Sequence, residues 1–224
     1  MLLLIPSLSP ANNSEDIVAI AALVIYVVWA VLAFGLRTFV QWRRTGDTGF
    51  RGGDLAKGSV QWWARVLFTG ALLIGAAGPV AALVGLPAIT VLDHVVVQLL
   101  GLVSTITGVA ATLAAQTSMG SSWRVGVQED ERTDLVTGGA FALARNPVFT
   151  AMIVTAAGLA AMVPNVIAVV GLAVTVAAIQ MQVRAVEEPY LLRAHGAAYA
   201  AYAARVGRFL PRIGRLTPPP EARR

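Results

Sequence analysis

Two polar clusters interrupt an otherwise apolar chain, and both hold side chains that could do chemistry. The first spans residues 120–150 and is rich in glycine, hydroxyl and charged side chains. The second contains Arg184, Glu187 and Glu188 and directly follows an uncharged run over residues 148–183. Ionisable groups beside a segment at membrane depth are costly to bury and are functional candidates by default. We therefore expect the two clusters to meet and form one site.

Arg184 and Glu188 stand four residues apart, so on a regular α-helix they would share one face. We expect Glu187 to point elsewhere. The competing interpretation is an ion pair at a helix end, with the arginine reaching the lipid headgroups.

The Asn146-Pro147 pair predicts the start of a helix. Pro147 suits the first turn, where its missing N–H costs nothing, and Asn146 is then a candidate N-cap. The N–H groups of that turn could hold a carboxylate, such as the end of an amino-acid-like cofactor. The alternative is a plain helix cap, with Arg145 at the headgroups.

Two adjacent glycines precede Phe141 in the segment at residues 135–141. Glycine lets the backbone approach a flat ligand closely, and Phe141 could stack on it. An ordinary interfacial turn would explain the same residues.

The composition sets the class of protein. Of 224 residues 57% are hydrophobic and 13% charged, whereas a soluble domain carries about 25% charged residues. The deficit predicts one integral membrane domain over residues 1–224. Cysteine is absent, which excludes disulfides and thiolate chemistry. Neither histidine has a ligand set around it, so no metal site is predicted. The net charge of +5 suits anionic headgroups better than nucleic acid.

Uncharged runs predict the membrane helices, since about 20 apolar residues cross the hydrocarbon core. The first three predicted helices lie within residues 17–36, 66–92 and 95–119, and the second of them ends near Pro87. The run over residues 148–183 is long enough for two more helices, which are separated at Pro164-Asn165. A surface helix follows, bending at Pro189 and stopped by Pro211, before a disordered tail at residues 217–224. The predicted fold is all-α: a polytopic membrane bundle of five transmembrane helices plus a cytoplasmic C-terminal helix.

Charge predicts the orientation of this bundle. All 17 Lys and Arg residues fall on the side that holds residues 37–65, residues 120–147 and the chain after Val183. The positive-inside rule makes that side cytoplasmic. We expect a multi-pass protein of the inner or plasma membrane, if prokaryotic, with its N-terminus outside and its site and C-terminus in the cytoplasm.

The order of these motifs resembles the isoprenylcysteine carboxyl methyltransferase family and its phospholipid methyltransferase relatives. The resemblance covers residues 120–211. The motifs that carry it are Gly-Ser-Ser-Trp-Arg-Val-Gly at 120–126, Leu-Val-Thr-Gly-Gly-Ala-Phe at 135–141, Arg-Asn-Pro-Val-Phe at 145–149, Arg-Ala-Val-Glu-Glu-Pro-Tyr-Leu at 184–191, His195-Gly196, Tyr199, Tyr202 and Phe209-Leu-Pro211. It implies a membrane methyltransferase that uses S-adenosyl-L-methionine, releases S-adenosyl-L-homocysteine and has a cytoplasm-facing pocket.

The resemblance also implies roles for particular residues. The cofactor site would be lined by Thr133, Asp134, Leu135, Val136, Phe141, Asn146, Pro147, Val148 and Phe149. Glu188 would hold the charged end of the cofactor, and Arg184 would face the acceptor. Two positions depart from the family's pattern: Asn146 stands where it usually has His, and Phe149 where it usually has Tyr. Those departures leave the acceptor undetermined.

The resemblance implies a lipophilic or small acceptor that enters from the membrane. Arg184 would fix a carboxylate bidentately, and a carboxylate needs no base because it is already ionised. A thiol or amine would need one, for which Glu187 is the candidate, so Arg184 and Glu187 are the predicted catalytic residues. The alternatives are a membrane reductase of the sterol-reductase type that uses NADPH, or a non-catalytic protein with a vestigial pocket. We expect the lipid bilayer as partner, no nucleic acid and no obligate protein partner.

Overall fold

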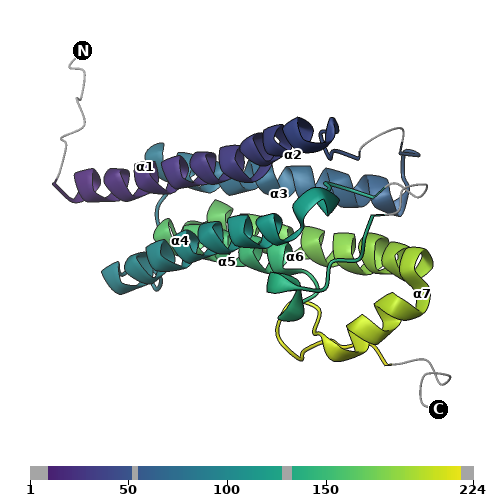
Figure 1. Cartoon of the computed structure of the whole chain (residues 1–224). Coiled ribbons are helices and arrows are strands. Elements are labelled where there is room, and N and C mark those ends of the chain that lie inside the picture. Colours follow the sequence, from purple (N-terminus) through teal and green to yellow (C-terminus); the bar gives the residue numbers. More distant parts are fainter. Residues whose placement is uncertain (1–9, 52–54, 128–132, 218–224) are drawn as a thin grey trace.

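The computed structural model describes residues 10–51, 55–127 and 133–217 (Figure 1). The expected disordered tail, apart from Thr217, and residues 128–132 of the polar stretch lie outside the described residues. Within the described ranges the chain forms seven α-helices and no strand, which confirms the all-α class. They are α1 (Pro10–Ala30), α2 (Arg37–Thr45), α3 (Val60–Leu83), α4 (Val95–Ser118), α5 (Pro147–Met162), α6 (Val166–Met181) and α7 (Glu188–Arg205).

Two π-helical turns interrupt the longest helices. The first π-turn, Val31–Leu36, connects α1 to α2, and the second π-turn, Gln182–Glu187, connects α6 to α7. Such turns insert wider backbone loops into a helix and are frequent at functional sites. Both lie between helices that continue on either side, so each changes which side chains face the interior without ending the helix.

The first helix is longer than predicted. We expected it to end at Leu36, but the chain remains helical through Thr45. The helix ends at Gly46, which adopts φ 74°. The polar residues of α2 do not end the helix because two of them are buried: Arg37 is 8% exposed and Gln41 is 0% exposed. Their partners, described below, belong to the polar loop after α4.

Helix α3 begins earlier and ends earlier than predicted. Its N-cap is Ser59, whose hydroxyl accepts a hydrogen bond of 3.1 Å from the Trp62 N–H. Its end is set by Gly85 (φ 89°), not by Pro87. Gly85 N–H donates to the Ala82 carbonyl, and Leu86 N–H donates to the Ala81 carbonyl. This pair of bonds is the Schellman arrangement that satisfies the last carbonyls of a helix.

Helices α4, α5 and α6 follow the predicted boundaries closely. The break between α5 and α6 falls at Pro164-Asn165, as expected, and the Asn165 side chain accepts a hydrogen bond of 2.9 Å from Ala168 N–H. Helices α4 and α5 approach at glycine. A Cβ on Gly101 would lie only 2.7 Å from the Gly158 carbonyl oxygen, so the two backbones approach closely at this position.

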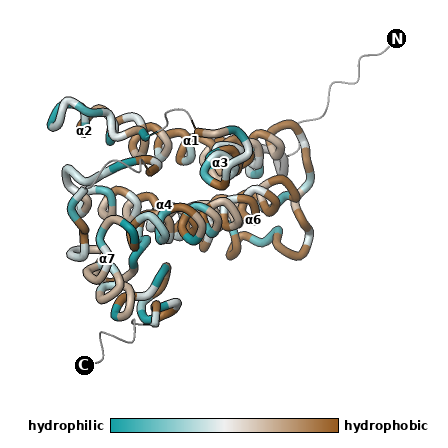
Figure 2. Tube along the Cα trace, turned by 90° about the vertical axis from the view of Figure 1, so that its right-hand side faces the viewer, coloured by the Kyte–Doolittle hydropathy of each residue, from teal (hydrophilic) through white to brown (hydrophobic). Residues whose placement is uncertain are grey.

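Four described helical segments are long and apolar enough to cross a membrane: Ser14–Thr45, Val60–Leu83, Val95–Ser118 and Val166–Arg205. Helix α5 is shorter; its 16 residues span about 24 Å. Figure 2 shows the hydrophobic stretches of the bundle extending away from a more hydrophilic end that includes α2 and α7. The chain is therefore an integral membrane protein by its helices, while five crossings remain a prediction.

The last helix breaks inside its length. The backbone leaves the helical conformation at Gly196 (φ 50°, ψ −123°), a region that only glycine adopts readily. We expected the bend at Pro189, but Pro189 lies in the first turn of α7, where proline is tolerated. After Gly196 the chain folds back toward the start of α5 (Figure 1), where the Arg145 N–H donates to the Gly207 carbonyl.

Candidate active site

A cavity of about 730 Å³ lies where the polar loop, the bundle and α7 meet. Its volume is in the range of sites that enclose a cofactor or a drug-sized ligand. Nine of its lining residues are the cofactor-site residues expected from the resemblance: Thr133, Asp134, Leu135, Val136, Phe141, Asn146, Pro147, Val148 and Phe149. Glu187 lines it as well. The two polar clusters of the sequence therefore meet around one cavity.

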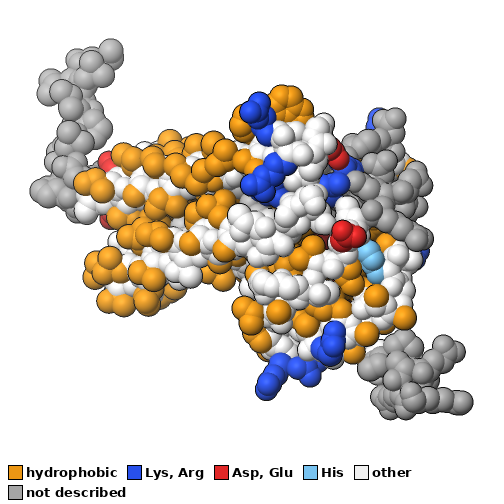
Figure 3. Space-filling view, viewed as in Figure 1, with side chains coloured by type: hydrophobic (Ala, Val, Ile, Leu, Met, Phe, Trp, Pro, Cys, Tyr) orange, Lys and Arg blue, Asp and Glu red, His pale blue; other side chains and the backbone are white. Residues whose placement is uncertain are grey.

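The cavity lies at the charged end of the molecule. On the face seen in Figure 3, Lys and Arg side chains gather toward one end, and the opposite part of the bundle is covered mainly by hydrophobic side chains. Arg51, Arg65, Arg124 and Arg145 line the cavity together with Asp134 and Glu187. The cavity therefore offers groups of both signs to a ligand.

Glu188 is held outside the cavity by two arginines. Its Oε1 accepts hydrogen bonds from Arg145 Nη2 at 2.5 Å and Arg208 Nε at 2.9 Å, and its Oε2 accepts one from Arg208 Nη2 at 2.8 Å. We call Arg145, Glu188 and Arg208 the arginine clamp. The hydrogen bond with Glu188 raises the pKa of Arg208 above its ordinary value, so the guanidinium stays charged. In this ion cluster both oxygens of Glu188 are paired with arginines.

Arg145 also holds the C-terminal segment in place. Its side chain is 1% exposed, and Nη1 donates to the carbonyls of Ala203 at 3.0 Å and Val206 at 2.6 Å. Nη2 donates to the Gly214 carbonyl at 3.1 Å. Arg145 is therefore a buried residue with a structural role, and the alternative that placed it at the lipid headgroups is wrong.

Arg184 and Glu188 do not share a face. Arg184 is exposed, donates to Gln180 Oε1 at 2.7 Å and does not line the cavity, whereas Glu188 is 6% exposed in the clamp. The prediction assumed a regular α-helix, but the second π-turn lies between these residues. The wider turn directs Glu187 to the cavity, where it accepts a bond of 3.1 Å from Gln182 Nε2.

The start of α5 borders the cavity without a side-chain cap. Pro147 occupies the first turn as predicted, but the Asn146 side chain makes no capping bond. Its Nδ2 donates instead to the Arg208 carbonyl at 3.1 Å. The first N–H groups of a helix have no intrahelical partner, and Val148 and Phe149 both line the cavity. Asn146 therefore occupies the predicted N-cap position without capping the helix through its side chain, and anion binding by this turn stays a prediction.

Helix α7 covers the segment that precedes α5. The Tyr202 hydroxyl donates to the Phe141 carbonyl at 2.6 Å. Tyr199, whose ring lies 6.1 Å from that of Tyr202, packs with it in a buried cluster to which Leu135 is added. Both tyrosines line the cavity. The C-terminal helix thus closes one side of the site.

Residues of α2 position the polar loop, a role that was not predicted from the sequence. Arg37 Nη2 donates to the Gly120 carbonyl at 2.6 Å, and its guanidinium carbon lies 4.9 Å from the centre of the Trp123 ring. Gln41 Nε2 donates to the Ser121 carbonyl at 2.9 Å. If the helix is extended past Leu36, Arg37 and Gln41 become polar residues of a helix that continues an apolar run. Such residues need hydrogen-bond partners, and the polar loop supplies them.

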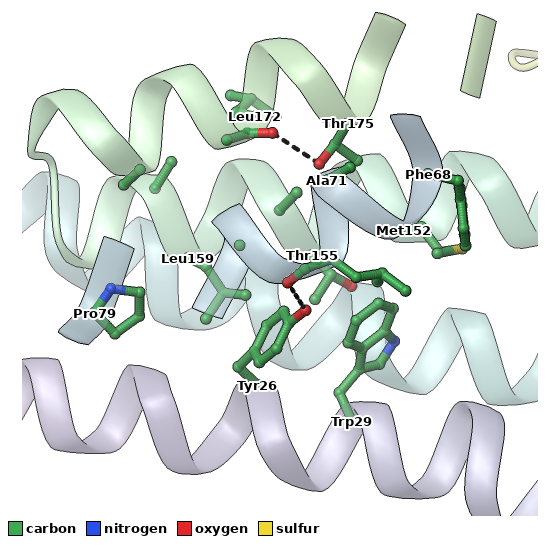
Figure 4. A pocket seen from close by; sticks show the side chains of 16 residues that line it. Tyr26, Trp29, Phe68, Ala71, Pro79, Met152, Thr155, Leu159, Leu172 and Thr175 are labelled. Atoms are coloured by element: carbon green, nitrogen blue, oxygen red, sulfur yellow. Dashed lines mark hydrogen bonds between the residues drawn. The ribbon is translucent and has the colours of Figure 1, made fainter. Parts of the chain in front are cut away.

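A second, much smaller cavity of about 40 Å³ lies deeper between α1, α3, α5 and α6. Tyr26 and Trp29 point toward it from α1 (Figure 4), and the Tyr26 hydroxyl donates to the Leu72 carbonyl at 2.5 Å. It shares Phe68, Leu72 and Met152 with the wall of the large cavity. Its size suits a water molecule rather than a substrate.

Comparison with known proteins agrees with this architecture. A family model described as phospholipid methyltransferase matches residues 96–198, from the start of α4 into α7. No curated protein matches the chain. The matched segment contains the polar loop, the start of α5 and Glu187, which line part of the cavity. Residues 96–198 are therefore similar to phospholipid methyltransferases, in agreement with the resemblance seen in the motifs of the chain.

Proposed function

We propose that the large cavity binds S-adenosyl-L-methionine and that the protein transfers its methyl group to a lipophilic acceptor. The observation that carries this proposal is the meeting, around one cavity, of the polar loop, the uncapped start of α5 and Glu187. S-adenosyl-L-methionine supplies an electrophilic methyl group on a sulfonium. Alignment of acceptor, methyl group and sulfur accounts for much of the rate of such a transfer.

The lining residues fit the charges of this cofactor. The N–H groups of Val148 and Phe149 at the start of α5 suit the cofactor's carboxylate. Glu187 suits its positive charges, because a carboxylate in a cavity attracts an ammonium or a sulfonium. Phe141 offers a ring to the flat adenine. Glu187 thereby takes the role that the resemblance gave to Glu188, whose oxygens are engaged in the arginine clamp.

The acceptor would occupy the part of the cavity formed by the bundle. There Ala30, Phe34, Phe68 and Leu72 give an apolar wall that suits a hydrocarbon chain. Arg184 is left out of this proposal because it is exposed and does not line the cavity. The strongly basic end of the bundle supports a cytoplasmic site, where a water-soluble cofactor would enter.

Glu187→Gln tests the proposal by removing the charge with little change in shape. In calorimetric titrations of the detergent-solubilised full chain, we expect the affinity for S-adenosyl-L-methionine to fall by about 10- to 100-fold, as for loss of a charged hydrogen bond. Glu15→Gln, which removes an exposed carboxylate on α1, is the control and should bind as the wild type does. Equal affinity in wild type and Glu187→Gln would overturn the assignment of Glu187.

A further inference from the structure

The segment after α7 holds two large apolar side chains out from the fold on a closed turn. We call residues 206–216 the C-terminal loop. Leu210 is 51% exposed and Ile213 is 64% exposed. The turn between them is ordered, because the Ile213 N–H donates to the Leu210 carbonyl at 3.2 Å and the Arg208 N–H donates to the Ile213 carbonyl at 2.7 Å. Apolar side chains that a fixed turn exposes together mark an interaction surface.

The hydrogen bonds of the loop place it at the edge of the membrane. The Asn146 N–H donates to the Arg208 carbonyl at 3.1 Å, and the Thr150 hydroxyl donates to the Phe209 carbonyl at 2.8 Å. Both donors belong to the start of α5, where the uncharged run of residues 148–183 begins. Phe209 packs against the buried cluster of α1, α5 and α6. Leu210, the next residue, therefore projects outward at the level where α5 enters its apolar run.

The charges of the loop fit an anionic surface. Arg212 and Arg215 lie on either side of Ile213 in the sequence, and both are exposed. No acidic residue occurs between positions 189 and 220. In the part of Figure 3 where Figure 1 draws the chain after α7, Lys or Arg side chains lie beside hydrophobic ones. Apolar side chains interleaved with arginines are typical of segments that lie in a bilayer interface and contact anionic headgroups.

We propose that the C-terminal loop docks on the anionic lipid surface of the membrane that the helices cross. Leu210 and Ile213 enter the boundary between headgroups and acyl chains, and Arg212 and Arg215 contact the lipid phosphates. Because Arg208 of the same loop pairs with Glu188, docking also ties the arginine clamp to the membrane. The inference does not rest on the proposed function, since it involves neither the large cavity nor a ligand in it.

Fluorescence quenching in lipid nanodiscs tests the contact. The chain has no cysteine, so Ile213→Cys and Leu210→Cys each give one site for an environment-sensitive fluorophore. The discs hold one protein each and contain phosphatidylglycerol, phosphatidylcholine and a lipid with a nitroxide high on its acyl chain. We expect both labels to lose most of their fluorescence. Ala198→Cys, at an exposed site of α7 just after the break at Gly196, is the control and should stay bright.

The two loop positions report the same contact, so local damage by one label does not decide the result. Bright labels at both positions would overturn the inference. That result would also be obtained if a second copy of the chain covered the loop, because each disc holds one protein. Equal quenching of the label at Ala198→Cys would overturn it as well, by showing that the whole of this end lies in the lipid.

A second comparison tests the part played by charge. Quenching at Ile213→Cys should fall when phosphatidylcholine replaces phosphatidylglycerol, and adding Arg212→Gln with Arg215→Gln should remove this dependence on the lipid. Arg43→Gln with Arg44→Gln, which neutralises two exposed arginines of α2, is the matched control and should leave the dependence unchanged. The same quenching in both lipids, or a dependence that survives neutralisation of the loop, would overturn the assignment to anionic headgroups.

Discussion

Glu187 and Glu188 are neighbours in the sequence, yet they belong to two regions with opposite properties. In the arginine clamp, Glu188 accepts three hydrogen bonds from two arginines and is 6% exposed. At the cavity, the bond from Gln182 is the one hydrogen bond to Glu187 found among the described residues. The difference teaches that the clamp uses charge to hold the fold, while the cavity keeps acceptor atoms available for a ligand.

The largest expected effect breaks the clamp. Arg145→Met removes one partner of a buried ion cluster and takes one donor each from the carbonyls of Ala203, Val206 and Gly214. Removing one partner of a buried pair costs about 3–5 kcal/mol of unfolding free energy. Denaturant unfolding of the purified protein in detergent measures the loss.

Arg184→Met is the matched control for that experiment. Arg184 is exposed on the second π-turn, and a surface substitution of this kind stays within about 0.5 kcal/mol of wild type. Equal stability of the two variants would contradict the division between clamp and cavity, because it would make Arg145 as dispensable as a surface arginine.

A smaller effect is expected where α7 covers the cavity. Tyr202→Phe removes the hydroxyl that donates to the Phe141 carbonyl, which costs about 1–2 kcal/mol. The loss should be local, so hydrogen exchange should accelerate at the segment of Phe141 and much less in α4. Uniform acceleration throughout the bundle would show that α7 stabilises the whole fold rather than this edge of the site.

The smallest effect concerns the connector before α3. Hydrogen bonds from Arg51 and from the Gly49 N–H hold the pKa of Asp47 well below its ordinary value. A lowered pKa stabilises the fold fully above the unfolded pKa of about 4, and this contribution disappears as the pH falls through the folded value. Because Asp47 is 37% exposed, the effect of Asp47→Asn should be small, largest near neutral pH and reduced in acid. Melting curves of wild type and variant across pH check this; a difference that grows on acidification would contradict it.

Much of the bundle could be predicted because long uncharged runs indicate membrane helices. The breaks at Pro164-Asn165 and the starts of α4 and α5 follow directly from that pattern. The end of α3 is also readable from the sequence, since Gly85 is a typical C-terminal glycine, although the prediction placed the end near Pro87. The continuation to Thr45 was missed because the partners of Arg37 and Gln41 lie far along the chain.

The segments that line the cavity were predicted from the sequence, but the hydrogen bonds and ion pairs of the side chains were not. The motifs around Leu135 and Asn146 placed the cavity segments correctly. The prediction that Arg184 and Glu188 share a helix face is wrong because residues four apart lie on one face of an α-helix but not across a π-turn. The partnership of Arg145 with Arg208 and Glu188 depends on how the chain folds back after Gly196, which local sequence patterns do not specify.

The most direct test of the central claim is ligand binding by the wild-type chain. Thermal unfolding of the purified protein is measured with S-adenosyl-L-homocysteine, with NADPH and without ligand. We predict that S-adenosyl-L-homocysteine raises the unfolding temperature in a concentration-dependent way and that NADPH does not. Stabilisation by NADPH alone would assign the cavity to a reductase, and no stabilisation by either would leave it a vestigial pocket; both results contradict a methyl-transfer site.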